Sequence, residues 1–147
     1  MVRLRGRVVV PHAVLPDGIV EYDGDTIARV VPVDRVEGHL PPASDDLLLP
    51  GLVDVHCHGG GGMSFPDARD AAEAMVAVRE HRNHGTTTLV ASLVTAPREA
   101  LVASTRLLAA LADAGEIAGI HLEGPFISTG HPGAQDPASI RDPDPAL

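Results

Sequence analysis

Aromatic residues and cysteine are scarce in this sequence, and each scarcity excludes a class of protein. Phe, Tyr and Trp make up 2% of the 147 residues, so any core must be built from Val, Leu, Ile and Ala. The single cysteine, Cys57, excludes an internal disulfide framework and favours a reducing compartment. Apolar runs of membrane-spanning length and a signal-like apolar segment are also absent. We therefore expect a soluble cytoplasmic protein with no membrane partner.

Positive charge is scarce as well. Eleven Lys and Arg face 20 Asp and Glu, which gives a net charge of −9. Because no Lys/Arg cluster occurs, the sequence gives no support for nucleic-acid binding. An anionic small molecule is not excluded, since such sites are local. The hydrophobic content of 44% is that of a globular protein.

The first third of the chain predicts short β-strands. Apolar residues suggest strands at 2–10, 19–22 and 26–33, and the Asp-Gly-Asp sequence at 23–25 is a strong hairpin signal. Residues 36–46, with two prolines and several charges, read as a loop. Three short strands cannot form a stable sandwich alone, so we expect them to pair with strands from elsewhere.

Residues 47–62, LLLPGLVDVHCHGGGG, organise the rest of the chain. The apolar run predicts a parallel strand that is buried on both faces. Because strand side chains alternate, His56 and His58 should point to one side and Cys57 to the other. Two adjacent imidazoles can chelate a cation such as Zn²⁺. A bare His-x-His is weak evidence, since eight histidines occur in 147 residues, and two satisfied strand-end histidines are the alternative.

The pattern after the glycines alternates between helix and strand. Asp67 is a candidate N-cap for a helix over 68–84, and 86–94 (TTTLVASLV) reads as a buried strand. A second helix should begin near Pro97, before a third strand at 117–123. This order predicts βαβ units with right-handed crossovers and a parallel sheet.

Glu123 lies at the carboxyl end of the third strand, as His56 and His58 do on the first. Functional groups of parallel α/β barrels gather at these strand ends, and a carboxylate can join two imidazoles around a metal. The alternative is an isolated surface glutamate. His121, two residues earlier on the same side, is interpreted as a packed histidine rather than a ligand.

Three motifs resemble those of known enzymes. PGLVDVHCHG at 50–59 resembles the first barrel strand of the metal-dependent amidohydrolase superfamily, and HGTTT at 84–88 continues the match. HLEGPF at 121–126 resembles the signature of the N-acetylglucosamine-6-phosphate deacetylases. The resemblance implies an α/β fold. Residues 1–48 would be β-strands of a composite β-sandwich, and 49–147 the first three β/α units of a partial TIM barrel.

The resemblance also implies a site. Glu123 matches the family's central metal ligand, and His56 and His58 would join it to hold a divalent metal, zinc, as one or two ions. The loop at 127–137 resembles a substrate loop in which a histidine contacts the sugar. Here Gln135, which follows Ala134, stands where that histidine is expected, and both residues are implied to bind substrate. Gln135 can form hydrogen bonds but cannot become cationic.

The implied reaction is the deacetylation of N-acetylglucosamine 6-phosphate to glucosamine 6-phosphate and acetate. The expected partner is a small amino-sugar phosphate, and the full-length family implies a homodimer. The catalytic Asp and two later metal-binding histidines should follow Leu147, so we expect an N-terminal part that is inactive alone. A dihydroorotase-like or deaminase-like amidohydrolase and a non-catalytic fragment are the alternatives, and HLEGPF favours the deacetylase.

Overall fold

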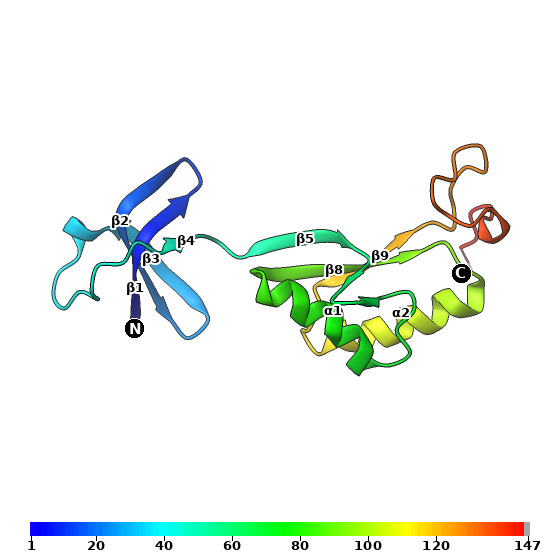
Figure 1. Ribbon diagram of the computed structural model, residues 1–147, viewed down its shortest axis with the longest axis horizontal. Coiled ribbons are helices and arrows are strands. Elements are labelled where there is room, and N and C mark those ends of the chain that lie inside the picture. The colour runs from blue at the N-terminus through cyan, green and yellow to red at the C-terminus, as the bar shows by residue number, and fades with distance from the viewer. Residues whose placement is uncertain (146–147) are drawn as a thin grey trace. The chain divides into compact units, whose positions relative to one another are not determined.

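The computed structural model describes residues 1–145, which divide into two compact units. The first unit is Met1–Pro50, and the second begins at Gly51. Figure 1 draws the first unit in blue to cyan and the second from blue-green to red. None of the helices within residues 1–145 is long and apolar enough to cross a bilayer.

The first unit is a four-stranded sheet in the order β3-β2-β1-β4. Its strands are β1 (Val2–Val10), β2 (Ala13–Asp23), β3 (Thr26–Pro32) and β4 (Leu47–Leu48), and a short 3-10 helix, η1 (Val33–Arg35), follows β3. The predicted hairpin at 23–25 is confirmed, with Gly24 at φ +59° as such a turn requires. β2 begins earlier than predicted, because a register shift opposite Pro16 accommodates the missing N–H of that residue.

Glu21 is the main buried charge of this sheet. It lies on β2 between Arg3 of β1 and Arg29 of β3, and both guanidinium groups donate hydrogen bonds to its carboxylate, Arg3 at 2.7 Å. The hydrogen bond from Arg29 lowers the pKa of Glu21, burial opposes this, and Arg3 lowers the pKa further, to about 2. The three strands are therefore joined by an ion-paired triad as well as by their backbone ladder.

The single buried strand predicted from residue 47 onward is wrong. β4 pairs in parallel with β1 in the first unit, whereas β5 (Leu52–Cys57) begins the second unit. The break falls at Pro50 and Gly51. Proline has no N–H to donate, and a Cβ on Gly51 would come within 2.1 Å of the Thr87 side chain. The apolar run is thus divided between two strands that belong to different sheets.

The second unit contains a three-stranded sheet with two helices on one face (Figure 1). The sheet order is β5-β8-β9, with β8 (Thr86–Val94) parallel to both β5 and β9 (Gly119–Glu123). The helices are α1 (Ala71–Asn83) and α2 (Arg98–Asp113). A small ribbon of β6 (Gly59–Gly60) and β7 (Met63–Ser64) follows β5, and a 3-10 helix, η2 (Pro137–Ser139), lies in the last loop. The predicted β-α-β-α-β order and parallel sheet are confirmed.

The expected burial of β5 on both faces is also wrong. Leu52, Val53 and Val55 are 50%, 64% and 66% exposed. β5 is an edge strand in the described part of the chain, so one side of it has no neighbouring strand there to cover its side chains. Cys57, in contrast, is buried in the core beneath α1.

The start of the first helix differs from the prediction. α1 begins at Ala71, and its N-cap is Asp70 rather than Asp67. The Asp70 carboxylate accepts the Glu73 N–H at 2.9 Å, and the Glu73 carboxylate accepts the Arg69 N–H at 2.8 Å. This reciprocal arrangement satisfies two backbone donors that a cap at Asp67 would leave unbonded.

Candidate metal centre

The end of β5 brings the two predicted histidines together. Their Nε2 atoms are 2.9 Å apart, and the rings meet edge to face with their centroids 4.9 Å apart. Asp54 holds the backbone on the amino side of His56, because its Oδ1 accepts the His56 N–H at 3.1 Å. The predicted alternation is confirmed: His56 and His58 lie on one side, and Cys57 is buried on the other.

Glu123 reaches these imidazoles from β9, across the intervening strand β8. Its Oε2 lies 3.2 Å from Nε2 of His56 and 2.9 Å from Nε2 of His58. Burial raises the pKa of Glu123, but its hydrogen bonds and charge interactions with the two histidines outweigh burial and place the pKa below its usual value. The carboxylate is therefore ionised at neutral pH.

The three residues fit a divalent cation. Two imidazole nitrogens and a carboxylate oxygen are a common donor set for zinc and related ions, and here all three atoms lie within hydrogen-bonding distance of one another. His58 Nδ1 is buried and has no hydrogen-bond partner among the described residues. If Nε2 of His58 binds an ion, Nδ1 carries the ring proton and requires a hydrogen-bond acceptor that the described residues do not supply.

Ser92 of β8, which was not predicted from the sequence, contacts residues next to two of the candidate ligands. Its hydroxyl accepts the Cys57 N–H at 3.1 Å and lies 3.1 Å from Nδ1 of His121. The His121 ring in turn packs edge to face against His56, at a centroid distance of 4.9 Å. This agrees with the interpretation of His121 as a packed residue. The signal available in the sequence was a serine within the apolar segment 86–94, and the structure shows that this serine is fully buried.

The structure does not bring the predicted sugar-binding residues to the three ligands. Gln135 is buried, and its Oε1 accepts the Thr95 N–H at 2.7 Å, while Ala134 is exposed. The connection to the centre is indirect, because the Thr95 hydroxyl donates to the Glu123 carbonyl at 3.1 Å. The role of Gln135 and Ala134 in substrate binding stays a prediction.

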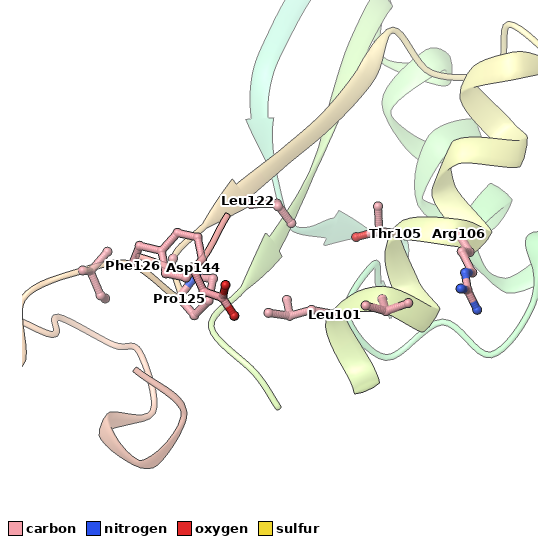
Figure 2. A pocket seen from close by; sticks show the side chains of 10 residues that line it. Leu101, Thr105, Arg106, Leu122, Pro125, Phe126 and Asp144 are labelled. Carbon is pink, nitrogen blue, oxygen red and sulfur yellow. The ribbon is translucent and has the colours of Figure 1, made fainter. Parts of the chain in front are cut away.

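A separate apolar groove lies on the opposite face of β9 (Figure 2). It has a volume of about 580 Å³ and is lined mainly by Leu101 and Thr105 of α2, by Leu122 of β9 and by Phe126. Leu122 precedes Glu123 on the strand, so the two side chains point to opposite faces. The groove is therefore not part of the metal centre.

The chain is similar to known proteins in sequence and in fold. The model of the amidohydrolase family matches residues 47–147. An N-acetylglucosamine-6-phosphate deacetylase from Bacillus subtilis (strain 168) is 32% identical over 152 residues, covering 95% of this chain and 38% of the relative. An N-acetylgalactosamine-6-phosphate deacetylase from Shewanella sp. (strain ANA-3) is 29% identical, covering 85% of this chain and 32% of the relative.

A solved structure is similar over nearly the whole chain. The crystal structure of N-acetyl-D-glucosamine-6-phosphate deacetylase from Mycobacterium smegmatis superimposes with a TM-score of 0.83 at 43% sequence identity, covering 99% of this chain and 39% of that protein. The chain thus spans about a third to two fifths of the length of these relatives. Its family match extends over more than half of its residues. The chain belongs to the amidohydrolase family, whose members are metal-dependent.

Proposed function

We propose that this chain is the first part of a metal-dependent deacetylase of N-acetylglucosamine 6-phosphate. The observation that carries the proposal is the convergence of His56, His58 and Glu123 at the carboxyl ends of β5 and β9. This is the end of a parallel sheet at which barrel enzymes assemble their active sites. The names of the B. subtilis and M. smegmatis relatives suggest the reaction.

In this proposal, His56, His58 and Glu123 hold zinc as one or two ions. When bound, zinc polarises the acetamide carbonyl and lowers the pKa of water. The chain's own residues would hold the ion. The imidazole nitrogens of His56 and His58 donate lone pairs to it, and the ionised Glu123 balances part of its charge. Ser92 and Asp54 hold the backbone of the ligand strand in place.

The second unit would be the first three β/α units of a TIM barrel. Two features support this arrangement. The exposed apolar side chains of β5 and the groove beside β9 lie at the two edges of the described sheet, where neighbouring β/α units of a barrel would pack. The proposal assigns two further metal-binding histidines and the catalytic Asp to that remaining barrel, and it assigns the first unit to a composite β-sandwich.

The substrate would enter over the ligands, beside the loop that carries Ala134 and Gln135. We assign a small amino-sugar phosphate to this site, and we include in the proposal a homodimeric, cytoplasmic enzyme. The relative named as an N-acetylgalactosamine-6-phosphate deacetylase makes the C4 epimer the natural competitor. The two sugars should therefore be compared directly.

A chimeric enzyme tests the proposal. Residues 1–147 would replace the matching segment of the M. smegmatis deacetylase, to which they are 43% identical. We expect zinc-dependent release of acetate from N-acetylglucosamine 6-phosphate, and loss of that activity in the His56→Ala and Glu123→Gln variants. His12→Ala, in an exposed turn of the first unit, is the matched control and should retain activity.

Two outcomes would contradict the proposal. One is a folded, zinc-loaded chimera that releases no acetate from either N-acetylhexosamine 6-phosphate. The other is activity that persists in the His56→Ala and Glu123→Gln variants. Activity on dihydroorotate or on a deaminase substrate instead would favour the alternative branches of the superfamily.

A further inference from the structure

A second group of metal-binding side chains lies between β5 and the last turn of α1. Cys57 Sγ is 3.1 Å from Nε2 of His81, and the other ring nitrogen, Nδ1, is 4.0 Å from Oδ2 of Asp54. One potential ligand atom from each of these residues lies within 4.8 Å of the others. The group shares no side chain with the His56, His58 and Glu123 centre.

Two glycines allow His81 to approach the strand. Nε2 of His81 lies 3.0 Å from the carbonyl oxygen of Gly59, and a Cβ on Gly60 would be 2.9 Å from the same nitrogen. The Cys57 Sγ is itself 3.5 Å from the Gly59 oxygen. Sulfur, nitrogen and oxygen atoms therefore surround one point, and a side chain at position 60 would close the space.

Exposure of these side chains supplies an entry path. Cys57 is 5% exposed and forms the floor, whereas the side chains of His81 and Asp54 are 27% and 32% exposed and form the rim. An ion would approach the thiol from the side of the imidazole and the carboxylate, which are the exposed members of the group. A buried thiol in an otherwise closed core would have no such access.

We propose that Cys57, His81 and Asp54 form a second metal site that takes a borderline divalent ion such as Zn²⁺. Thiolate, imidazole and carboxylate are all ligands of zinc, and the soft sulfur disfavours Mg²⁺ and Ca²⁺. Binding replaces the S–H bond of Cys57 with a sulfur–metal bond and releases the proton to solvent. The thiolate and the carboxylate then neutralise the charge of the ion.

The distance between Cys57 Sγ and His81 Nε2 is close to the one that zinc requires. With zinc–sulfur at about 2.3 Å and zinc–nitrogen at about 2.0–2.1 Å, a tetrahedral angle separates sulfur from nitrogen by about 3.6 Å. The observed 3.1 Å requires the two side chains to move apart by about half an ångström. A bound ion would tie α1 to the strand that carries His56 and His58.

Cobalt titration of the 147-residue chain tests the site. Co²⁺ replaces Zn²⁺ and, when bound to a thiolate, gives a sulfur-to-cobalt charge-transfer absorption in the near ultraviolet that nitrogen and oxygen ligands do not give. We expect this absorption in the wild-type chain, its loss in Cys57→Ser and at least tenfold weaker binding in His81→Gln. The absorption should persist in a His56→Ala, Glu123→Gln double variant.

The outcomes separate this site from the proposed function. A folded wild-type chain that binds cobalt without the sulfur absorption would overturn the second site, and no variant is needed for that observation. Unchanged affinity of the sulfur-bound cobalt in His81→Gln would also overturn it, because the thiol would then bind alone. If the absorption appears but the His56→Ala, Glu123→Gln variant loses no cobalt, the second site stands and the metal centre of the proposed function fails.

Discussion

Gln135 has a structural role, because its side chain accepts a hydrogen bond from the Thr95 N–H. Gln135 is buried, and its carbonyl oxygen holds the 127–137 loop against the end of β8. Thr95 also bonds to the Glu123 backbone, so the loop and a ligand strand share one anchor. Loss of the side chain would therefore disturb packing as well as any contact with sugar.

Gln135→Ala should lower the free energy of unfolding of the second unit by about 1–3 kcal/mol, because the Thr95 N–H would be buried without an acceptor. Gln135→Glu keeps an oxygen for Thr95 and should retain most of the stability. Chemical denaturation followed by the helical circular dichroism signal measures both variants. In the chimera, a lower kcat/KM for Gln135→Glu at unchanged stability would support a sugar contact, and equal stability of all three proteins would refute the structural role.

Glu21 gives the first unit a dependence on pH. Its pKa of about 2 lies below the usual 4.5 of a glutamate because Arg29 and Arg3 stabilise the carboxylate. A group with a depressed folded-state pKa contributes its full stabilisation above the unfolded-state pKa. That contribution is lost as the pH falls from about 4.5 towards 2.

We expect the free energy of unfolding of the first unit to fall over this acid range. The Glu21→Gln variant should be less stable than wild type at pH 7, and its stability should fall less on acidification. Tyr22, the single tyrosine of a chain without tryptophan, lies on β2 and makes its fluorescence a probe of this unit. Urea unfolding at several pH values gives the free energy of unfolding of the first unit as a function of pH. Glu37→Gln, an exposed position, is the control. An acid dependence of Glu21→Gln equal to that of wild type would show that another group titrates.

At the scale of elements, the beginning of α1 is determined by one capping interaction. Asp67 and Asp70 both precede the helical pattern, but only Asp70 is followed three residues later by a glutamate, Glu73. The structure places the cap at Asp70, where its carboxylate accepts the Glu73 N–H. The helix therefore begins three residues later than the apolar periodicity suggests.

Asp70→Ala should lower the free energy of unfolding of the second unit by about 1 kcal/mol, within a range of about 0.5–2 kcal/mol for a lost N-cap. Asp67→Ala should be nearly neutral, since its side chain caps no helix in this structure. The helical circular dichroism signal follows unfolding of both variants, because both long helices lie in the second unit. A larger loss of stability in Asp67→Ala than in Asp70→Ala would contradict the cap at Asp70 and favour the N-cap predicted from the sequence, Asp67.

At the scale of the whole chain, the candidate metal centre lies on the sheet face that neither α1 nor α2 covers. Leu52, Val53 and Val55 of β5 are at least half exposed, and each ligand side chain is at least one-third exposed. Water at such a site competes for the metal and screens the field that would polarise a carbonyl. Three ligands can bind an ion here, but hydrolysis also requires a positioned proton carrier.

The 147-residue chain should therefore bind zinc without releasing acetate from N-acetylglucosamine 6-phosphate. The assay compares the wild-type chain and the His56→Ala chain, each with added Zn²⁺, beside the chimera described above. Turnover by the wild-type chain that disappears in His56→Ala would mean that these residues contain a complete active site. Activity in the chimera alone would show that the rest of the barrel is required.

The sequence by itself determined the β-α-β-α-β order of the second unit and the side chains of the candidate metal centre. Strand alternation placed His56 and His58 on one side, and the carboxyl end of the third strand placed Glu123, because both follow from local backbone geometry. The same local rules predicted the Asp-Gly hairpin and the parallel βαβ order. These features need no knowledge of distant contacts.

Tertiary structure decided the remainder. The apolar run from residue 47 was divided between two units because β1 pairs with β4 and Thr87 closes over Gly51, and neither contact is visible in the pattern itself. The burial of Gln135 against Thr95 and the support by Ser92 depend on residues 28–40 positions apart. The approach of His81 to Cys57 likewise depends on how α1 packs against β6, β7 and β8. Periodicity reports which face a residue occupies, but only packing decides which side chains meet across that face.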